Sequence, residues 1–367
     1  MGTRTMKATG IVGVFAVVLA CSSNGVDCPQ PCPQNQICQG GSCVCEASEP
    51  DICNGTCTSL ATDAQNCGQC GATCDGTCVG GQCVITLVAA TESGGALGGI
   101  AVDATSVYWA DLGAQSVRKI PKTGGSITTL ASNQASMGKS LTIGGSSIFW
   151  SRCDDTSTIA AGVPIAGGAV FTIAAVSGTT CGVAVVGTPG DLWVAEDANA
   201  ATMGIISDRT LPYNGVFSIL AGQQEHVLGL AINPLRAFWT TNTAVRSASR
   251  TGTPNVKTLV AGASTSTLGA IAADANNVYW MGQSTLYTVP VNGGTARAVP
   301  GPTSARALVL DGSRLYFGSD YGIGYVDLST EETVTLVPMN GVAGLALDST
   351  SIYWTNANGV VSVLLKP

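Results

Sequence analysis

The stretch Ile100-Ala-Val-Asp-Ala-Thr-Ser-Val-Tyr-Trp109 leads through a polar turn to Val117-Arg-Lys-Ile-Pro121 and, past Gly124-Gly125, to Ile127-Thr-Thr-Leu130. Its short apolar runs alternate with polar residues and are separated by turn-forming residues, as in consecutive antiparallel strands. The same order of residue types returns at 271–294 and at 345–354. One repeated unit therefore organises most of the chain.

The repeat is measured on the aromatic residue that ends the Tyr-Trp pair, which recurs at spacings of 41, 43, 46, 41, 37 and 37 residues. This alignment gives one position to all six tryptophans and one phenylalanine: Trp109, Trp150, Trp193, Trp239, Trp280, Phe317 and Trp354. A period of about 40–45 residues with four short strands is typical of a β-propeller blade. We predict an all-β fold, a seven-bladed β-propeller with four-stranded blades over 84–367.

The first unit predicts strands at 99–103, 107–111, 117–121 and 127–131. The last unit has room for only three strands, whereas a spare strand, Val84-Ile-Thr-Leu-Val-Ala-Ala90, precedes the first unit. Pairing this N-terminal strand with the last unit would close the ring and leave no unpaired sheet edge. An open solenoid is the alternative, but it would need capping repeats, and the sequence shows none.

Turn residues support this division. An acidic or amide residue that can form an Asx turn follows the first strand of five units: Asp103, Asn233, Asp274, Asp311 and Asp348. Three units have a glycine pair before the fourth strand, where a tight hairpin needs positive φ: Gly124-Gly125, Gly167-Gly168 and Gly293-Gly294. Proline ends the third strand in the same units, a place that tolerates a missing donor: Pro121, Pro164 and Pro290.

The N-terminus has the pattern of an export signal. Arg4 and Lys7 precede an apolar run at 11–20, which is too short to span a bilayer as a helix. The run ends in Val18-Leu-Ala-Cys21-Ser, which resembles the lipobox of bacterial lipoproteins. This resemblance implies a signal peptide at 1–20, a lipidated tether at 21–27 and attachment of the protein to a lipid bilayer through the acyl anchor on Cys21. The expected location is the bacterial cell envelope, at the outer membrane or cell surface. The alternative is a plain secretory signal.

A cysteine-rich module occupies 28–83. It holds 12 of the 15 cysteines, and removing Cys21 as a lipid anchor leaves an even number that can pair. The module has too few apolar residues for a core, so we expect disulfides to stabilise it. Its first part is similar in spacing to EGF-like modules, and the second to cysteine-rich segments of bacterial surface lipoproteins. The spacing of Cys67-Gly-Gln-Cys70 also suits zinc or a redox pair, but the module contains no histidine.

Composition limits the function classes. The chain has 367 residues, 47 glycines, 11 % charged residues and a formal net charge of −7. This is a turn-rich globular protein, and its acidity argues against binding nucleic acid through a basic face.

Three units carry a recognisable motif: Tyr108-Trp-Ala-Asp111, Phe238-Trp-Thr-Thr241 and Tyr353-Trp-Thr-Asn356. They resemble the YWTD-type propellers and the broader NHL-like and lactonase-like propellers. The YWTD family has six blades, whereas seven units are counted here. The resemblance implies a propeller fold and carries no particular function with it.

One loop face carries the candidate site. The second-to-third-strand loops place on it Arg152, Asp154, Asp155, Glu196, Asp197, Asp320 and Tyr321, an acidic mouth over the channel. Loops on such a face are where ligands dock, although solvated loop residues would give the same pattern. Cys153 and Cys181 flank neighbouring blades on this face, and we expect a disulfide between them, with a free thiol as the alternative.

Catalytic candidates are few. His226 is the only histidine, and no Gly-x-Ser-x-Gly motif accompanies it. We therefore expect a non-catalytic binding or interaction platform for an unknown protein or glycan ligand, with no cofactor or metal; calcium is the ion that an acidic mouth would suit. The alternatives are a lactonase- or lyase-like enzyme, resembling virginiamycin B lyase, and a purely structural envelope protein.

Overall fold

The computed structural model describes residues 28, 32–33, 35–153, 158–174, 181–197, 204–210, 217–224, 226–263 and 270–367. It forms two compact units, Met1–Ser59 and Leu60–Pro367. The division falls inside the cysteine-rich segment, so the second part of that segment belongs to the same compact unit as the propeller. Each unit is described by itself.

The first unit contains two hairpins, β1 (Gln36–Gln39) with β2 (Ser42–Cys45) and β3 (Asp51–Cys53) with β4 (Thr56–Thr58). Three disulfides lie within it: Cys28–Cys38, Cys32–Cys43 and Cys45–Cys57. Its one described cluster of potential metal ligands, the sulfurs of Cys28, Cys32 and Cys43, is therefore already in disulfides. Cys53 is also disulfide-bonded.

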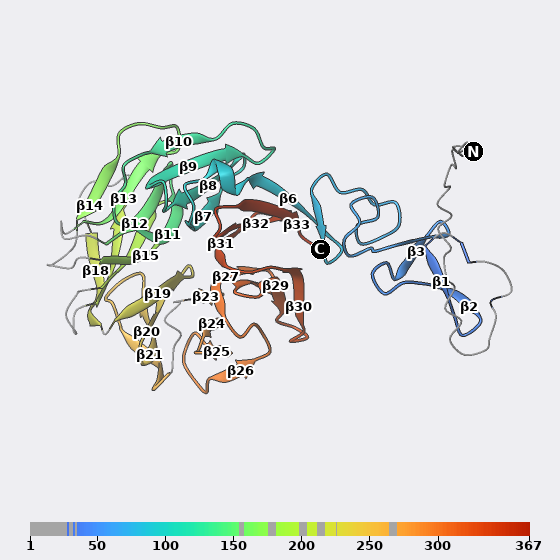
Figure 1. Cartoon of the computed structure of the whole chain (residues 1–367). Coiled ribbons are helices and arrows are strands. Elements are labelled where there is room, and N and C mark those ends of the chain that lie inside the picture. Colours follow the sequence, from blue (N-terminus) through green and yellow to red (C-terminus); the bar gives the residue numbers. More distant parts are fainter. Residues whose placement is uncertain are drawn as a thin grey trace, which may run out of the picture. The chain divides into compact units, whose positions relative to one another are not determined.

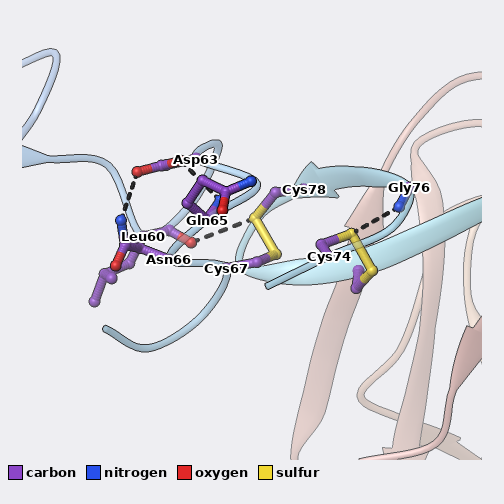
Figure 2. The surroundings of a disulfide bond; sticks show 9 residues. Leu60, Asp63, Gln65, Asn66, Cys67, Cys74, Gly76 and Cys78 are labelled. Atoms are coloured by element: carbon purple, nitrogen blue, oxygen red, sulfur yellow. Dashed lines mark hydrogen bonds between the residues drawn. A yellow bond between two sulfur atoms is a disulfide. The ribbon is translucent and has the colours of Figure 1, made fainter. Parts of the chain in front are cut away.

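The start of the second unit repeats the first hairpin. Cys78 and Cys83 face each other across β5 (Thr77–Val79) and β6 (Gln82–Val88), as Cys38 and Cys43 do across β1 and β2. The disulfides Cys67–Cys78 and Cys74–Cys83 hold this copy. Figure 2 shows the loop beside them, where Asp63 accepts hydrogen bonds from the Gln65 amide (2.9 Å) and the Asn66 side chain (2.7 Å).

Six of the blades are four-stranded antiparallel sheets whose strands follow one another in sequence. Blade one consists of β7 (Leu97–Val102), β8 (Ser106–Asp111), β9 (Ser116–Pro121) and β10 (Thr128–Ala131), and blade two of β11 (Met137–Gly144), β12 (Ser147–Arg152), β13 (Thr158–Pro164) and β14 (Phe171–Ala174). Blade three consists of β15 (Cys181–Gly187), β16 (Asp191–Asp197), β17 (Gly204–Thr210) and β18 (Phe217–Gln224), and blade four of β19 (Val227–Ile232), β20 (Arg236–Thr241), β21 (Ala244–Ser249) and β22 (Lys257–Ala261). Blade five consists of β23 (Ile271–Ala273), β24 (Asn277–Met281), β25 (Leu286–Pro290) and β26 (Arg297–Val299), and blade six of β27 (Ala305–Asp311), β28 (Arg314–Ser319), β29 (Gly322–Asp327) and β30 (Thr333–Pro338). Figure 1 shows these sheets arranged around a common centre.

Blade seven closes the ring as predicted. Its sheet joins β31 (Val342–Leu347), β32 (Ser351–Asn356) and β33 (Val361–Leu365) to β6 and then β5. Figure 1 shows β6 beside β33, and Ile85 pairs with Val363. The short 3₁₀ helix η1 (Ala90–Glu92) then leads into blade one. Val79 and Val84 pack with residues of blades six and seven, so the disulfide-held hairpin is part of the propeller core.

The blades meet through two adjacent positions of the second strand. Tyr108 packs in one cluster with Trp150 of the next blade, and Trp109 packs in another cluster with Tyr353 of the preceding blade. All six tryptophans are at most 2 % exposed. Successive strand residues point to opposite faces, so a Tyr-Trp pair fills the contact on both sides of a blade.

Blade three corrects the alignment of the tryptophans. Thr188 and Asp191 close its first turn as Asp103 and Ser106 close that of blade one. Counting from these turns, Trp193 occupies the place of Tyr108, and Val194 occupies the place of Trp109. The clusters agree, because Trp193 packs with Trp239 of the next blade. Five tryptophans, not six, therefore share one position.

Asx turns form at four of the five predicted sites, whereas the carboxylate of Asp311, the fifth, accepts a hydrogen bond from Lys366. Asp103 Oδ1 accepts the amides of Thr105 (2.7 Å) and Ser106 (2.8 Å), while Oδ2 accepts the hydroxyl of Tyr108 (2.7 Å). Equivalent amide bonds form at Asn233, Asp274 and Asp348. The predicted glycine pairs also have positive φ. The tyrosine of the Tyr-Trp pair thus has a second role, which is to bond the turn that precedes it.

Candidate functional site

A cavity of about 560 Å³ lies at the centre of the ring. Every blade contributes to its lining from the beginning of its first strand, and two second-to-third-strand turns add Leu112 and Ala357. The cavity therefore lies at the end of the channel where the predicted loop face is. Its wall is mainly aliphatic, with residues such as Leu97, Leu228 and Val342.

Lys139 and Arg306 are the charged residues among those that line the cavity in the described part of the chain. They hold equivalent positions in two blades. Lys139 lies two residues before Leu141, the partner of Trp150, and Arg306 lies two residues before Leu308, the partner of Phe317. Blades two and six are nearly opposite in a ring of seven, so the two cations enter the cavity lining from opposite sides.

Arg306 is held in place by a carboxylate. Its Nε donates to Asp320 Oδ1 at 2.7 Å, and the Ser304 hydroxyl donates to Asp320 Oδ2 at 2.7 Å. The hydrogen bonds from Arg306 and Ser304 lower the pKa of Asp320 below its usual value. Asp320 is therefore ionised at neutral pH and orients the guanidinium through its Nε side.

Asp320 and Tyr321 lie on the turn between β28 and β29, where the sequence placed them. The Tyr321 side chain is exposed, with 70 % of its surface accessible. Asp320 itself is engaged with Arg306 and Ser304 and is not a free carboxylate. The described part of this mouth thus has an ion pair where the sequence suggested an acidic group alone.

Glu196 is not a mouth residue. It is fully buried, and its Oε1 accepts from Arg209 Nη2 at 3.0 Å and from the Ser207 hydroxyl at 3.1 Å. Arg209 is 1 % exposed and also donates to the carbonyl of Ala174 in blade two at 3.1 Å. The alternation of strand β16 places Glu196 on a blade face, so the expectation of an exposed ligand group at this position was wrong.

The other predicted residues are placed in part. Arg152 ends β12 and is half-buried. Cys153 is disulfide-bonded, and the side chain of Cys181, which begins β15, lies outside the described residues. Asp154, Asp155 and the side chain of Asp197 also lie outside them, as does the tether with Cys21.

Groups for acid–base chemistry are not gathered in the described lining, which contains no histidine, cysteine or carboxylate. The Ser140 hydroxyl lines the cavity but is bonded to the backbone of Val185, accepting from its amide at 3.0 Å. His226 is exposed and lies directly before β19. Among the described residues, no helix is long and apolar enough to cross a membrane.

Lys139 and Arg306 were missed in the sequence, although a signal was present. Each lies 11 residues before the aromatic of its unit, Trp150 and Phe317. At the same offset, the other aligned units have small or aliphatic residues such as Gly98, Leu228 and Ala343. A cation at a first-strand position that repeats as apolar is therefore the mark of a channel residue.

Comparison with known proteins gives the fold and no closer kinship. No family model matches the chain, and no curated protein matches it. Virginiamycin B lyase from Staphylococcus aureus is 16 % identical, with a TM-score of 0.62 over 77 % of this chain and 98 % of that one. A histidine variant of that lyase, described as catalytically inactive and solved with quinupristin, gives 0.63 at 16 % identity over 77 % and 99 %.

A gluconolactonase from Xanthomonas campestris gives a TM-score of 0.51 at 12 % identity over 78 % of this chain and 90 % of that one. At these identities the likeness concerns the propeller fold alone.

Proposed function

We propose that this chain is an exported, lipid-anchored envelope protein whose propeller is a non-catalytic binding platform, with the central cavity as its ligand site. The observation that carries the proposal is the cavity itself, about 560 Å³ with an aliphatic wall and two cations. Small-molecule sites are typically concave, mostly apolar and about 300–1,000 Å³, with a few polar groups that orient the ligand.

The export signal and the disulfides support the location. The five disulfides within the two units indicate an extracellular or envelope compartment, because such bonds persist in oxidising surroundings. The sequence Val18-Leu-Ala-Cys21 supports an acyl anchor on Cys21. The anchor is tested by replacing Cys21 with serine, which should abolish labelling by radioactive palmitate and release the protein from membranes.

The enzyme alternative has less support. The lyase and the lactonase share this fold, and the inactive histidine variant indicates that the lyase needs a histidine. In this chain His226 is the only histidine, and it is exposed rather than part of the described lining. A binding role needs no acid–base pair, so it fits the described cavity better.

The experiment that tests binding is a thermal-shift screen of the Cys21→Ser protein against small molecules, glycans and peptides. A ligand of the cavity should raise the melting temperature of the parent protein. Ala343→Phe adds a large ring to the cavity lining and should remove or reduce that shift. Ala298→Phe, on the exposed outer strand β26, is the matched control. Turnover of a hit would favour the enzyme, and hits that respond equally to both variants would reject the cavity as the site.

A further inference from the structure

The sign of the charge in the cavity lining is opposite to that of the whole chain. The chain has 23 acidic residues against 16 lysines and arginines, yet the described lining contains two cations and no carboxylate. Both cations are at first-strand positions that in other blades are small or aliphatic. Lys139 is exposed, and Arg306 is 36 % exposed and shares one edge with Asp320. Both cations are therefore accessible from the cavity, and this arrangement favours an anionic ligand.

Arg306 has the geometry of a prepared anion receptor. Asp320 Oδ1 accepts a hydrogen bond from Arg306 Nε, which fixes the plane of the guanidinium. The Ser304 hydroxyl donates to the other oxygen of Asp320 and holds that carboxylate in place. The two Nη groups donate to no described residue, and the side chain is 36 % exposed. A guanidinium with one edge held and one edge open suits a two-point contact with a carboxylate.

The rest of the lining sets the class of ligand further. Aliphatic side chains from all seven blades would contact the body of a ligand, and such surface contributes about 25 cal/mol per Å² buried. A small inorganic anion would leave this surface unused. An uncharged apolar molecule would remove water from Arg306 and Lys139 without pairing them.

We infer, building on the proposed function, that the central cavity takes a small organic carboxylate with an apolar body. Its carboxylate contacts the open edge of Arg306, and Lys139 on the opposite side adds positive charge to the lining. The carboxylate can belong to a free aliphatic or aromatic acid or to the C-terminus of a short apolar peptide. Asp320 is a positioning residue in this site, since it acts through Arg306.

The test compares acids with neutral analogues of the same shape. The probes are 4-phenylbutyrate against 4-phenylbutanol, and N-acetyl-Leu-Phe as free acid against its amide. Dissociation constants are measured by calorimetry on the Cys21→Ser protein at pH 7 and two salt concentrations. We expect at least one acid to bind tenfold or more tightly than its analogue, and the stronger of the two acids identifies the source.

The variants locate the preference. The double variant Arg306→Met, Lys139→Met should reduce the acid-to-neutral ratio to near one, and Arg306→Met with Asp320→Asn gives the same loss without an unpaired carboxylate. Arg297→Met, which removes an exposed ion pair with Glu331, is the control and should keep the ratio. Asp320→Asn alone should weaken the acid severalfold and leave the neutral analogue unchanged.

Two results would overturn the inference. If the neutral analogues bind as well as the acids and Ala343→Phe removes both, the cavity is a binding site but the ligand class is wrong. If no probe binds the parent protein, the ligand class is rejected, and the cavity as a site is then decided by the thermal-shift screen with Ala343→Phe and Ala298→Phe.

Discussion

Blades one and three use the same strand positions with different side chains. Blade one has Tyr108 toward the next blade and Trp109 toward the preceding one, whereas blade three has Trp193 and Val194 in those places. The large ring has moved to the other face of the sheet. The difference shows that a propeller requires filled contacts between blades, but not one fixed residue pair to fill them.

The space left by the smaller Val194 is shared with a polar network. Leu192, Val194 and Glu196 point to one face of β16, the face that packs on blade two. Arg209 on the neighbouring strand extends along this face to Glu196 and to the carbonyl of Ala174. Blade one has a comparable pair, Arg118 with Asp111 at 3.3 Å, but there Arg118 is 19 % exposed.

The largest expected effect is from Arg209→Met. Removing one member of a buried ion pair leaves an uncompensated charge and costs about 3–5 kcal/mol. We expect the free energy of unfolding, measured in urea, to fall by about this amount at pH 7. Adding Glu196→Gln should recover part of the lost stability, because it removes the buried negative charge that Arg209 had compensated.

The matched control is Arg118→Met in blade one. Asp111 also accepts the amides of Gly94 and Ala114, each at 2.9 Å, so it keeps partners when Arg118 is lost. We expect a cost of about 1.5 kcal/mol, at the lower end of the range for hydrogen bonds to charged groups. Equal losses in the two variants would mean that blade three does not depend on its network more than blade one does.

Exchanging the aromatic between blades is the next prediction. Trp109→Val copies the side chain of blade three into blade one, where no arginine network fills the space, and a cavity costing about 2–4 kcal/mol results. Val194→Trp overfills a face that already holds Arg209 and should cost about 1–3 kcal/mol. Both are measured by urea unfolding with calorimetry as a check. A stabilising Val194→Trp would show that Val194 sits beside an empty space.

A smaller effect is expected from the tyrosine that bonds the turn. Tyr108→Phe removes a 2.7 Å hydrogen bond to Asp103, and Tyr279→Phe removes a 3.2 Å bond to Asp274. We expect losses of about 0.5–1.5 kcal/mol, with the larger loss at Tyr108. Blade three has no such bond, since Trp193 takes the tyrosine position. If both variants are neutral, the tyrosines serve packing alone.

The sequence predicts the ring well because its signals are local and repeated. The Trp109 position, the Asx turns and the glycine pairs specify strand order, and the spare strand at 84–90 specifies closure. Trp193 was misaligned because residue type was read in place of register. Counting Val194 instead changes the irregular spacings of 43 and 46 to 44 and 45, so the irregularity was itself the signal.

The site was less predictable. Glu196 and Asp320 were both counted as mouth carboxylates, yet each is paired with an arginine, Arg209 or Arg306, from another strand. A linear sequence shows that a carboxylate is near a loop, but not that a cation from a different strand neutralises it. Only the repeat offset of Arg306 and Lys139 carried information on the channel, and it required the blade register first.

The last expected effect, and the one that separates the blades by sign, is the response of stability to pH. In blade three, burial together with the nearby Asp191 raises the pKa of Asp208 to about 6, against the attraction of Arg250. The folded state then binds more protons than the unfolded state between about pH 4 and 6, so this group lowers stability as pH rises through that window.

In blade one, burial alone would raise the pKa of Asp103, but hydrogen bonds from Tyr108, Thr105 and Ser106 bring it below its usual value. Asp103 therefore contributes stability above about pH 4 that is lost as the pH falls further.

Asp208→Asn should stabilise the protein at pH 7.5 and have little effect at pH 4, whereas Asp103→Asn should destabilise it at pH 7.5 and have less effect near pH 3. The check is the urea concentration at the midpoint of unfolding, measured for each variant across this pH range. If Asp208→Asn stabilises the protein as much at pH 4 as at pH 7.5, its effect comes from packing and not from charge.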